Sequence, residues 1–365
     1  MSSKQRPVSL DYAPPPGELL ALTIEGLGIS ARELARRCGR SPKLITEVMS
    51  GKATLEPETA LQFERVLGVE ASIWLGMEAE YRLRLARNDE EALLSSGIKW
   101  LKNFPLADLE KRRVLDSQKP TASTVGQLLK FFGVASVEAC EEYCDSLGVS
   151  YRHSPTFSSD HHSLYAWLRL GEIEAQNLDC SDFERAKFLA ALDRVRSFSR
   201  TNHKDDDFLK LIQQELAPAG VAFVVIKPLG KMALSGVSRW LTSRKALIQQ
   251  TLRHMSDDHF WFTLFHEAAH LLLHSRKTVF VDGRKDSSGT AQEEAEANKW
   301  ATEFLIPRHA MAKFCQAGKF SEQSVSSFAE DLGIAPGIVV GQLQNAGCIS
   351  YGYLNQLKVR FEWTE

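Results

Sequence analysis

The chain has 365 residues, of which 44% are hydrophobic and 25% charged, so it is long enough for two or three domains with ordinary globular cores. Its formal net charge of −2 excludes a global basic field, and a nucleic-acid site must therefore be local. No run of about 18 apolar residues indicates a membrane span, and no apolar signal region precedes the first helices, so we expect a cytoplasmic protein without membrane contact.

Four regions follow one another along the chain. The first region, 1–95, begins with an extended arm that the proline cluster Pro14–Pro16 ends, and helical periodicity then runs to about Glu91. A helical middle region, 96–200, follows. Residues 201–312 mix short β-branched runs with helical patterns, and a small helical tail occupies 313–365. We therefore predict a multidomain protein with an all-α N-terminal domain, a helical middle, an α+β domain and a tail.

The N-terminal region contains two short helical patterns within 29–52. Ser30 is typical of an N-cap, with Glu33 placed to complete a capping box, and Gly39 ends the first helix. Ser41 caps the second helix. Two such helices joined by a glycine turn form a helix-turn-helix, in which the second helix enters the major groove of DNA.

A local surplus of basic residues in this pair suits contacts with phosphates. Lys43, Thr46 and Glu47 are placed to reach base edges. Helix corners that contact no DNA are also common, so the spacing alone leaves DNA binding open. The candidate DNA-binding residues are Arg37, Arg40, Ser41, Lys43, Thr46, Glu47 and Lys52.

The run from residue 16 to 83 resembles, nearly end to end, the Xre-type repressor domain of the HigA antitoxin family. The matching segments are "PGE", "LITEVMSGK", "PETAL" and "WLGMEAEY". The resemblance implies a homodimer that binds a palindromic operator in double-stranded DNA. The chain continues far beyond this domain, so an antitoxin role does not follow.

The α+β region begins with runs that predict strands, one at 220–229 and a polar-interrupted one at 233–241. Helical patterns follow at 256–274 and 291–305, joined by a polar, glycine-bearing loop. We expect the strand at 233–241 to form the sheet edge, where an extended peptide could pair with it.

The segment "HEAAHLLLH" sets two histidines, His266 and His270, on one helix face with Glu267 beside them. This spacing suits a zinc ion. The helix is apolar nearly all round and must be buried, where a carboxylate without a role is strongly disfavoured. His274 lies roughly 12 Å from His266 along the axis, too far to share one ion, so we expect a surface or helix-end histidine.

The next helix supplies a third ligand. Glu294 with Asn298 four residues later reproduces the Glu-x-x-x-Asp/Asn arrangement of thermolysin-like zincins. There the glutamate binds the metal, and the acid or amide holds a ligating histidine in place. Glu296 is the alternative ligand.

From about Gly220 to its end the chain resembles the ImmA/IrrE metallopeptidase family, whose two signature helices match "FWFTLFHEAAHLLLH" and "EEAEANKWATEFLIP". The resemblance implies a Zn2+-dependent endopeptidase that cleaves an intracellular regulator in a stress response. A repressor, a toxin–antitoxin component or the chain itself is the expected substrate. The segment "FAEDLGIAPGIVVGQLQNAGCISYGYLNQLK" matches the helical tail of that family, which we interpret as packing support.

In this interpretation Glu267 is the general base of a zinc-activated hydrolysis. Arg239 and His254 are candidates for stabilising the oxyanion. The alternative is a HigA-type transcriptional repressor whose zincin-like domain is a non-proteolytic sensor or assembly module.

Overall fold

The computed structural model describes residues 13–148, 161–201, 208–230, 232, 234–274, 280–281 and 291–363. The chain divides into two compact units. The first unit comprises Met1–Ile98 and Thr121–Ser123, and the second comprises Lys99–Pro120 and Thr124–Glu365. The finer boundaries at 95, 200 and 312 stay predictions.

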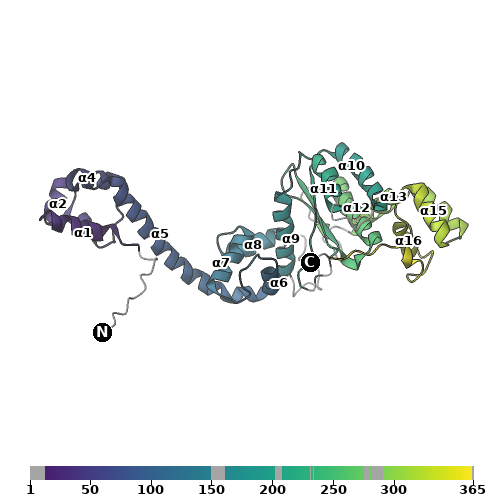
Figure 1. The fold of residues 1–365 in the computed structure, drawn as a ribbon, viewed down its shortest axis with the longest axis horizontal. Helices are drawn as coiled ribbons and strands as arrows, with labels where there is room; N and C mark the ends of the chain where they lie inside the picture. The colour runs from purple at the N-terminus through teal and green to yellow at the C-terminus, as the bar shows by residue number, and fades with distance from the viewer. Residues whose placement is uncertain are drawn as a thin grey trace, which may run out of the picture. The chain divides into compact units, whose positions relative to one another are not determined.

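The first unit is helical, as the periodicity predicted (Figure 1). Its core gathers the apolar sides of the helices around Phe63 and Trp74, whose rings meet edge to face at 5.7 Å, and the Trp74 indole donates to the Val69 carbonyl. The helices are α1 (Pro16–Gly26), α2 (Ala31–Cys38), α3 (Pro42–Met49), α4 (Pro57–Leu67) and α5 (Ala71–Ser96).

The predicted caps of α2 and α3 are present. Ser30 Oγ accepts the Glu33 backbone N–H at 3.2 Å, and Ser41 Oγ accepts the Leu44 N–H at 3.1 Å. Gly39 ends α2 with a φ of 62°, a conformation that glycine adopts without steric cost. The other half of the capping box was wrongly predicted. The Glu33 carboxylate forms ion pairs at 2.8 Å with two arginines one turn onward, Arg36 and Arg37, which attract it more strongly than a neutral N–H does.

The second unit combines helices with a small sheet. Its helices are α6 (Leu106–Lys111), α7 (Ala122–Phe132), α8 (Val137–Gly148), α9 (His161–Gln176), α10 (Arg185–Ser197), α11 (Phe208–Leu216), α12 (Asp257–Leu273), α13 (Ala291–Leu305), α14 (Arg308–Ala317), α15 (Glu322–Leu332) and α16 (Pro336–Asn345). Its strands are β1 (Val221–Val225), β2 (Gly236–Trp240), β3 (Ala246–Gln250) and β4 (Phe280–Val281). This supports the predicted α+β class.

The sheet has the order β1-β3-β2-β4, with β1 parallel to β3 and β2 antiparallel to both of its neighbours. Side chains alternate between its faces. Phe223 and Ile248 pack in the core that contains α12, whereas Val224 and Leu247 pack on the other side with Ala175 of α9. Helices therefore cover both faces, which explains why the strands read as nearly continuous apolar runs.

The prediction that 233–241 forms the sheet edge was wrong. β2 lies between β3 and β4, because Val237 pairs with Val281 and Ser238 with Phe280. The sequence indicated only a polar loop around β4, since a two-residue strand carries no readable alternation. In the described part of the sheet, β4 is the outer strand.

The tail packs as predicted. Val325 and Ala329 of α15, with Val339 and Leu343 of α16, belong to the same buried cluster as Phe265 of α12. The tail is thus continuous with the core that supports the signature helices. Within the described ranges no helix is both long and apolar enough to cross a membrane.

Candidate metal centre and DNA-reading surface

The helix α12 is buried along most of its length, as its apolar sequence requires. It packs against β2, β3, α13 and α16. Three of its polar side chains are fully enclosed: His266 and His270 are at most 2% exposed and Glu267 is at 0%. Burying three such groups costs free energy unless they have partners or a function.

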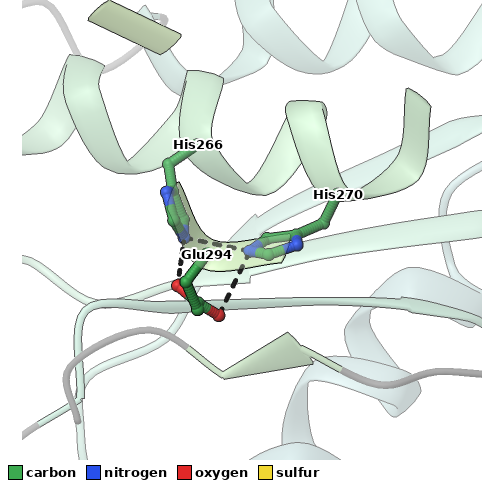
Figure 2. Close-up of side chains that lie close together, drawn as sticks. All are labelled: His266, His270 and Glu294. Atoms are coloured by element: carbon green, nitrogen blue, oxygen red, sulfur yellow. Dashed lines mark hydrogen bonds and ion pairs between the residues drawn. The ribbon is translucent and has the colours of Figure 1, made fainter. Parts of the chain in front are cut away.

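His266, His270 and Glu294 meet between α12 and α13 (Figure 2). The two Nε2 atoms of the histidines lie 3.0 Å apart. Glu294 Oε2 lies 3.4 Å from His266 Nε2, and Glu294 Oε1 lies 3.5 Å from His270 Nε2. One ligand atom from each of the three residues lies within 4.8 Å of the others. The structure thus brings together the three side chains that the sequence predicted as ligands.

The donor set fits a zinc ion. Two imidazole nitrogens and one carboxylate are the ligands of many catalytic zinc sites. Burial, together with the neighbouring rings of His266 and His274, lowers the pKa of His270 to about 2. The ring is therefore neutral, which is the form that binds a metal. That His266, His270 and Glu294 bind a metal stays a prediction.

Glu267 lies beside this group and against the sheet. A Cβ added at Gly236 of β2 would lie only 2.9 Å from Glu267 Oε1 and 2.8 Å from the Thr263 methyl carbon. The backbone of β2 therefore passes close to the Glu267 carboxylate. Only a residue without a side chain at position 236 permits this approach. No motif or periodicity in the sequence indicated this contact.

Glu296, the alternative ligand, faces a different residue. Its Oε2 lies 3.4 Å from Nε2 of His274, and its side chain is 48% exposed. His274 follows the last residue of α12, so the helix-end expectation is confirmed. The surface expectation is wrong, since its side chain is only 4% exposed. His274 Nδ1 lies 3.0 Å from Nδ1 of His270, and the His274 N–H donates to the His270 carbonyl, which holds His274 beside the last turn of α12.

A cavity of about 510 Å³ lies next to the candidate ligands. Phe262 and Thr263 line it from α12, one turn before His266, and Asn298 and Thr302 line it from α13, one and two turns after Glu294. The exposed side chain of Asn298 therefore faces the cavity, and its role in holding a histidine stays a prediction.

Of the two candidate residues for stabilising the oxyanion, Arg239 was wrongly predicted, because its side chain points away from the metal centre. Its guanidinium donates to the Leu168 carbonyl and lies 3.6 Å from Glu172, both in α9 on the opposite face of the sheet. His254 lines the cavity and stacks on His259 with the ring centroids 4.2 Å apart. Its φ of 68° is unusual for a residue with a side chain. Whether it acts on an oxyanion stays a prediction.

The candidate DNA contacts lie on α2, α3 and the turns around them. The side chains of Arg37, Lys43 and Thr46 are exposed, as are those of Ser41 and Lys52. Lys43 Nζ lies 3.7 Å from Glu47 Oε1, while Arg40 donates to Gln62 of α4 at 2.7 Å. Buried Ile45 and Val48 fix the other side of α3 in the core. The exposed side is therefore available to a ligand, and the DNA contacts themselves stay predictions.

One family model and two relatives match this chain. Residues 222–340 match the peptidase M78 family model, described as the IrrE N-terminal-like domain. The chain is also 33% identical over 79 residues to "Virulence-associated protein I" of Dichelobacter nodosus, covering 21% of this chain and 73% of that protein. It is 31% identical over 70 residues to "Uncharacterized HTH-type transcriptional regulator YddM" of Escherichia coli K12, covering 19% of this chain and 74% of that protein.

Proposed function

This chain belongs to the family of these two relatives, one of them an HTH-type transcriptional regulator, and carries an IrrE N-terminal-like domain; we propose that it is a DNA-binding regulator with a zinc-dependent endopeptidase domain. The substrate is an intracellular regulatory protein, either a repressor, a toxin–antitoxin component or the chain itself. Its cleavage changes transcription in a stress response.

The DNA-binding half of the proposal rests on the first unit. This unit contains the capped helices α2 and α3, and the stretches of 79 and 70 residues shared with the relatives are short enough to lie within it. Lys43 and Thr46 on the exposed side of α3 read bases, and Arg37 on α2 binds phosphate. A homodimer reads a palindromic operator, because one reading helix covers too few base pairs for specificity.

The peptidase half rests on one observation: two buried histidines and a carboxylate meet beside Glu267. His266, His270 and Glu294 would hold the zinc ion, and the family match spans all three residues. When bound, zinc supplies a Lewis acid for peptide hydrolysis.

The chain's own residues provide the acid–base chemistry. Glu267 accepts a proton from the attacking water as the new C–O bond forms, and it returns the proton to the amine nitrogen as the C–N bond breaks. Its full burial between α12 and β2 fixes the carboxylate and keeps bulk water away. A side chain of the substrate occupies the cavity beside Phe262 and Asn298.

The test is Glu267→Gln in the intact chain. The substitution keeps the side-chain volume and all three ligands, but the amide accepts no proton from water. We expect stoichiometric zinc by metal analysis and a loss of cleavage of several orders of magnitude. Candidate substrates are the products of neighbouring genes and the chain itself, followed by mass spectrometry for a specific cut.

Glu330→Gln in α15 is the matched control, because it makes the same change at an exposed carboxylate. It should cut at the wild-type rate. If Glu267→Gln cleaves at the wild-type rate, Glu267 is not the general base. Zinc-loaded wild-type protein that cuts none of these proteins would favour the non-proteolytic sensor.

A further inference from the structure

We propose that His274 and Glu296 are positioning residues for the metal centre, holding the His270 ring so that its Nε2 faces His266 and Glu294. This inference rests on the proposed function in that it assigns a metal to those three residues. It gives a role to two side chains that the ligand set leaves out.

Both nitrogens of His270 have defined neighbours. Nε2 lies 3.0 Å from His266 Nε2 and 3.5 Å from Glu294 Oε1, on the side where the ligands meet. Nδ1 lies 3.0 Å from Nδ1 of His274. His274 Nε2 in turn lies 3.4 Å from Glu296 Oε2. A continuous series of contacts therefore leads from the metal centre on α12 to a carboxylate on α13.

The protons of this series can be placed in one consistent way. A histidine that binds a metal through Nε2 is neutral and carries its proton on Nδ1. That Nδ1–H of His270 donates to Nδ1 of His274. A neutral His274 that accepts on Nδ1 carries its own proton on Nε2, which then donates to the Glu296 carboxylate. Each donor faces an acceptor, and the last acceptor is an anion, which makes the final hydrogen bond charge-assisted.

The end of α12 explains how His274 reaches this place. The residue lies just beyond the helix in an extended conformation, with φ of −113° and ψ of 173°, and its N–H donates to the His270 carbonyl at 3.1 Å. Its side chain is 4% exposed. A hydrogen bond in such an environment orients the ring strongly, because a buried donor without an acceptor loses its hydration with nothing to replace it.

Glu296 has its own support. Gln292, one turn earlier on α13, donates to Glu296 Oε1 at 2.9 Å and leaves Oε2 toward His274. The contacts with Gln292 and His274 hold the two oxygens of the Glu296 carboxylate in place. Since Glu294 lies two residues before Glu296, the same helix supplies both a ligand and the anion at the other end of the series.

Zinc affinity tests the inference directly. We expect His274→Phe, which keeps a ring but removes both nitrogens, to weaken the Kd for zinc about 10- to 100-fold in competition with a chromophoric chelator. His274→Gln should recover part of this loss, since its amide oxygen can accept the Nδ1–H of His270. Glu296→Gln, which keeps an acceptor but removes the charge, should weaken binding less than His274→Phe does. The cobalt-substituted His274→Phe protein should also show a shifted visible absorption spectrum, which lost stability alone would not produce.

His309→Phe is the matched control, because this exposed histidine of α14 is removed in the same way and should leave zinc affinity unchanged. Circular dichroism verifies that each variant is folded before zinc is added. If a folded His274→Phe protein binds zinc with wild-type affinity, the positioning role of His274 is wrong, but the metal centre itself is not contradicted. Wild-type chain that binds no zinc would overturn the metal centre together with this inference. Because the readout is zinc binding, a zinc-loaded chain without peptidase activity still tests His274.

Discussion

Gly236 shows how one residue of β2 constrains the candidate base. A Cβ at this position would lie 2.9 Å from Glu267 Oε1, 3.0 Å from its Cγ and 2.8 Å from the Thr263 methyl. Such contacts are too short for real atoms, so either the strand or the glutamate would move. The absence of a side chain at position 236 therefore fixes how closely Glu267 packs on the sheet.

We predict that Gly236→Ala lowers kcat of the proposed peptidase about tenfold to a hundredfold while zinc stays bound, because a displacement near 1 Å is enough to misplace a catalytic group. Steady-state kinetics with metal analysis would measure both effects. Gly352→Ala is the control, since a Cβ there meets no atom within 4 Å. An unchanged kcat in Gly236→Ala would show that the position of Glu267 does not limit the reaction.

Asp257, the first residue of α12, makes stability depend on pH. It is 0% exposed, and burial together with the charge of Asp258 raises its pKa to about 7. In the unfolded chain the pKa of the Asp257 carboxyl is about 4, the ordinary value for aspartate. Ionising Asp257 above this pH therefore costs more free energy in the folded state than in the unfolded state. This residue's contribution to stability therefore falls as pH rises from about 4 through 7.

Asp257→Asn should remove that dependence. We expect the variant to gain stability relative to the wild type on going from pH 5 to pH 8, by a few kcal/mol at most, since each pKa unit corresponds to about 1.4 kcal/mol. Urea unfolding of the intact chain at the two pH values measures the difference. A difference between variant and wild type that does not change with pH would contradict the raised pKa of Asp257.

At the scale of elements, an ion pair connects the C-terminal tail to α12. Lys358 Nζ lies 2.7 Å from Asp258 Oδ2 and donates to Gln344 Oε1 of α16 at 2.8 Å. The paired side chains are only 12% and 7% exposed. Although burial alone would raise it, hydrogen bonds from Lys358 and Ser256 lower the pKa of Asp258. The tail therefore neutralises a charge at the start of the helix that carries the candidate ligands.

We predict that Lys358→Met destabilises the second unit by about 3–5 kcal/mol, because the Asp258 carboxylate would remain buried without its cation. The double variant Lys358→Met with Asp258→Asn should recover much of the loss. Unfolding of the single and double variants measures this coupling. If the double variant is as unstable as Lys358→Met, the ion pair is not what holds the tail.

The sequence predicted α12 and α13 well because apolar periodicity and burial determine such helices. The spacing of His266, His270 and Glu294 placed the three side chains together for the same reason. Strand parity could have excluded Arg239: it is an odd number of residues from Gly236, which faces Glu267, and so points to the other face of the sheet. The contact of His274 with His270 was not predicted, although a residue four positions after His270 can reach it even though His266 is too far away.

At the scale of the molecule, the two compact units each have a core of their own. The core of the first unit includes Leu34, Ile45 and Trp74, and that of the second includes Phe223, Ile248 and Phe265. In the proposed function, the first unit binds DNA and the second binds zinc and substrate. Substitutions on α2 and α3 should therefore change DNA binding and leave zinc affinity unaffected.

Within the first unit, two substitutions should have different effects on DNA. Lys43 is exposed on α3 and forms a long ion pair with the nearby Glu47, so it can turn to a base edge. Arg37 forms an ion pair with Glu33 on α2, the helix that would cross the DNA backbone in the proposed complex. We predict that Lys43→Ala alters sequence preference at one base position of each half-site, at a cost of about 1–3 kcal/mol for the preferred base. Arg37→Ala should weaken binding to all sequences alike and reduce the slope of log K against log salt by about one.

Footprinting of the intact chain on the DNA upstream of its own gene, followed by titrations at several salt concentrations, separates the two effects. Arg87→Ala on α5 is the control, because it removes an exposed arginine that lies outside α2 and α3. It should change neither the preference nor the slope. If Lys43→Ala weakens binding to all DNA sequences equally, Lys43 contacts a phosphate and not a base, and its assignment as a base-reading residue of α3 is wrong. If the footprint shows no protected palindrome, the proposal that α3 binds an operator upstream of the chain's own gene is wrong.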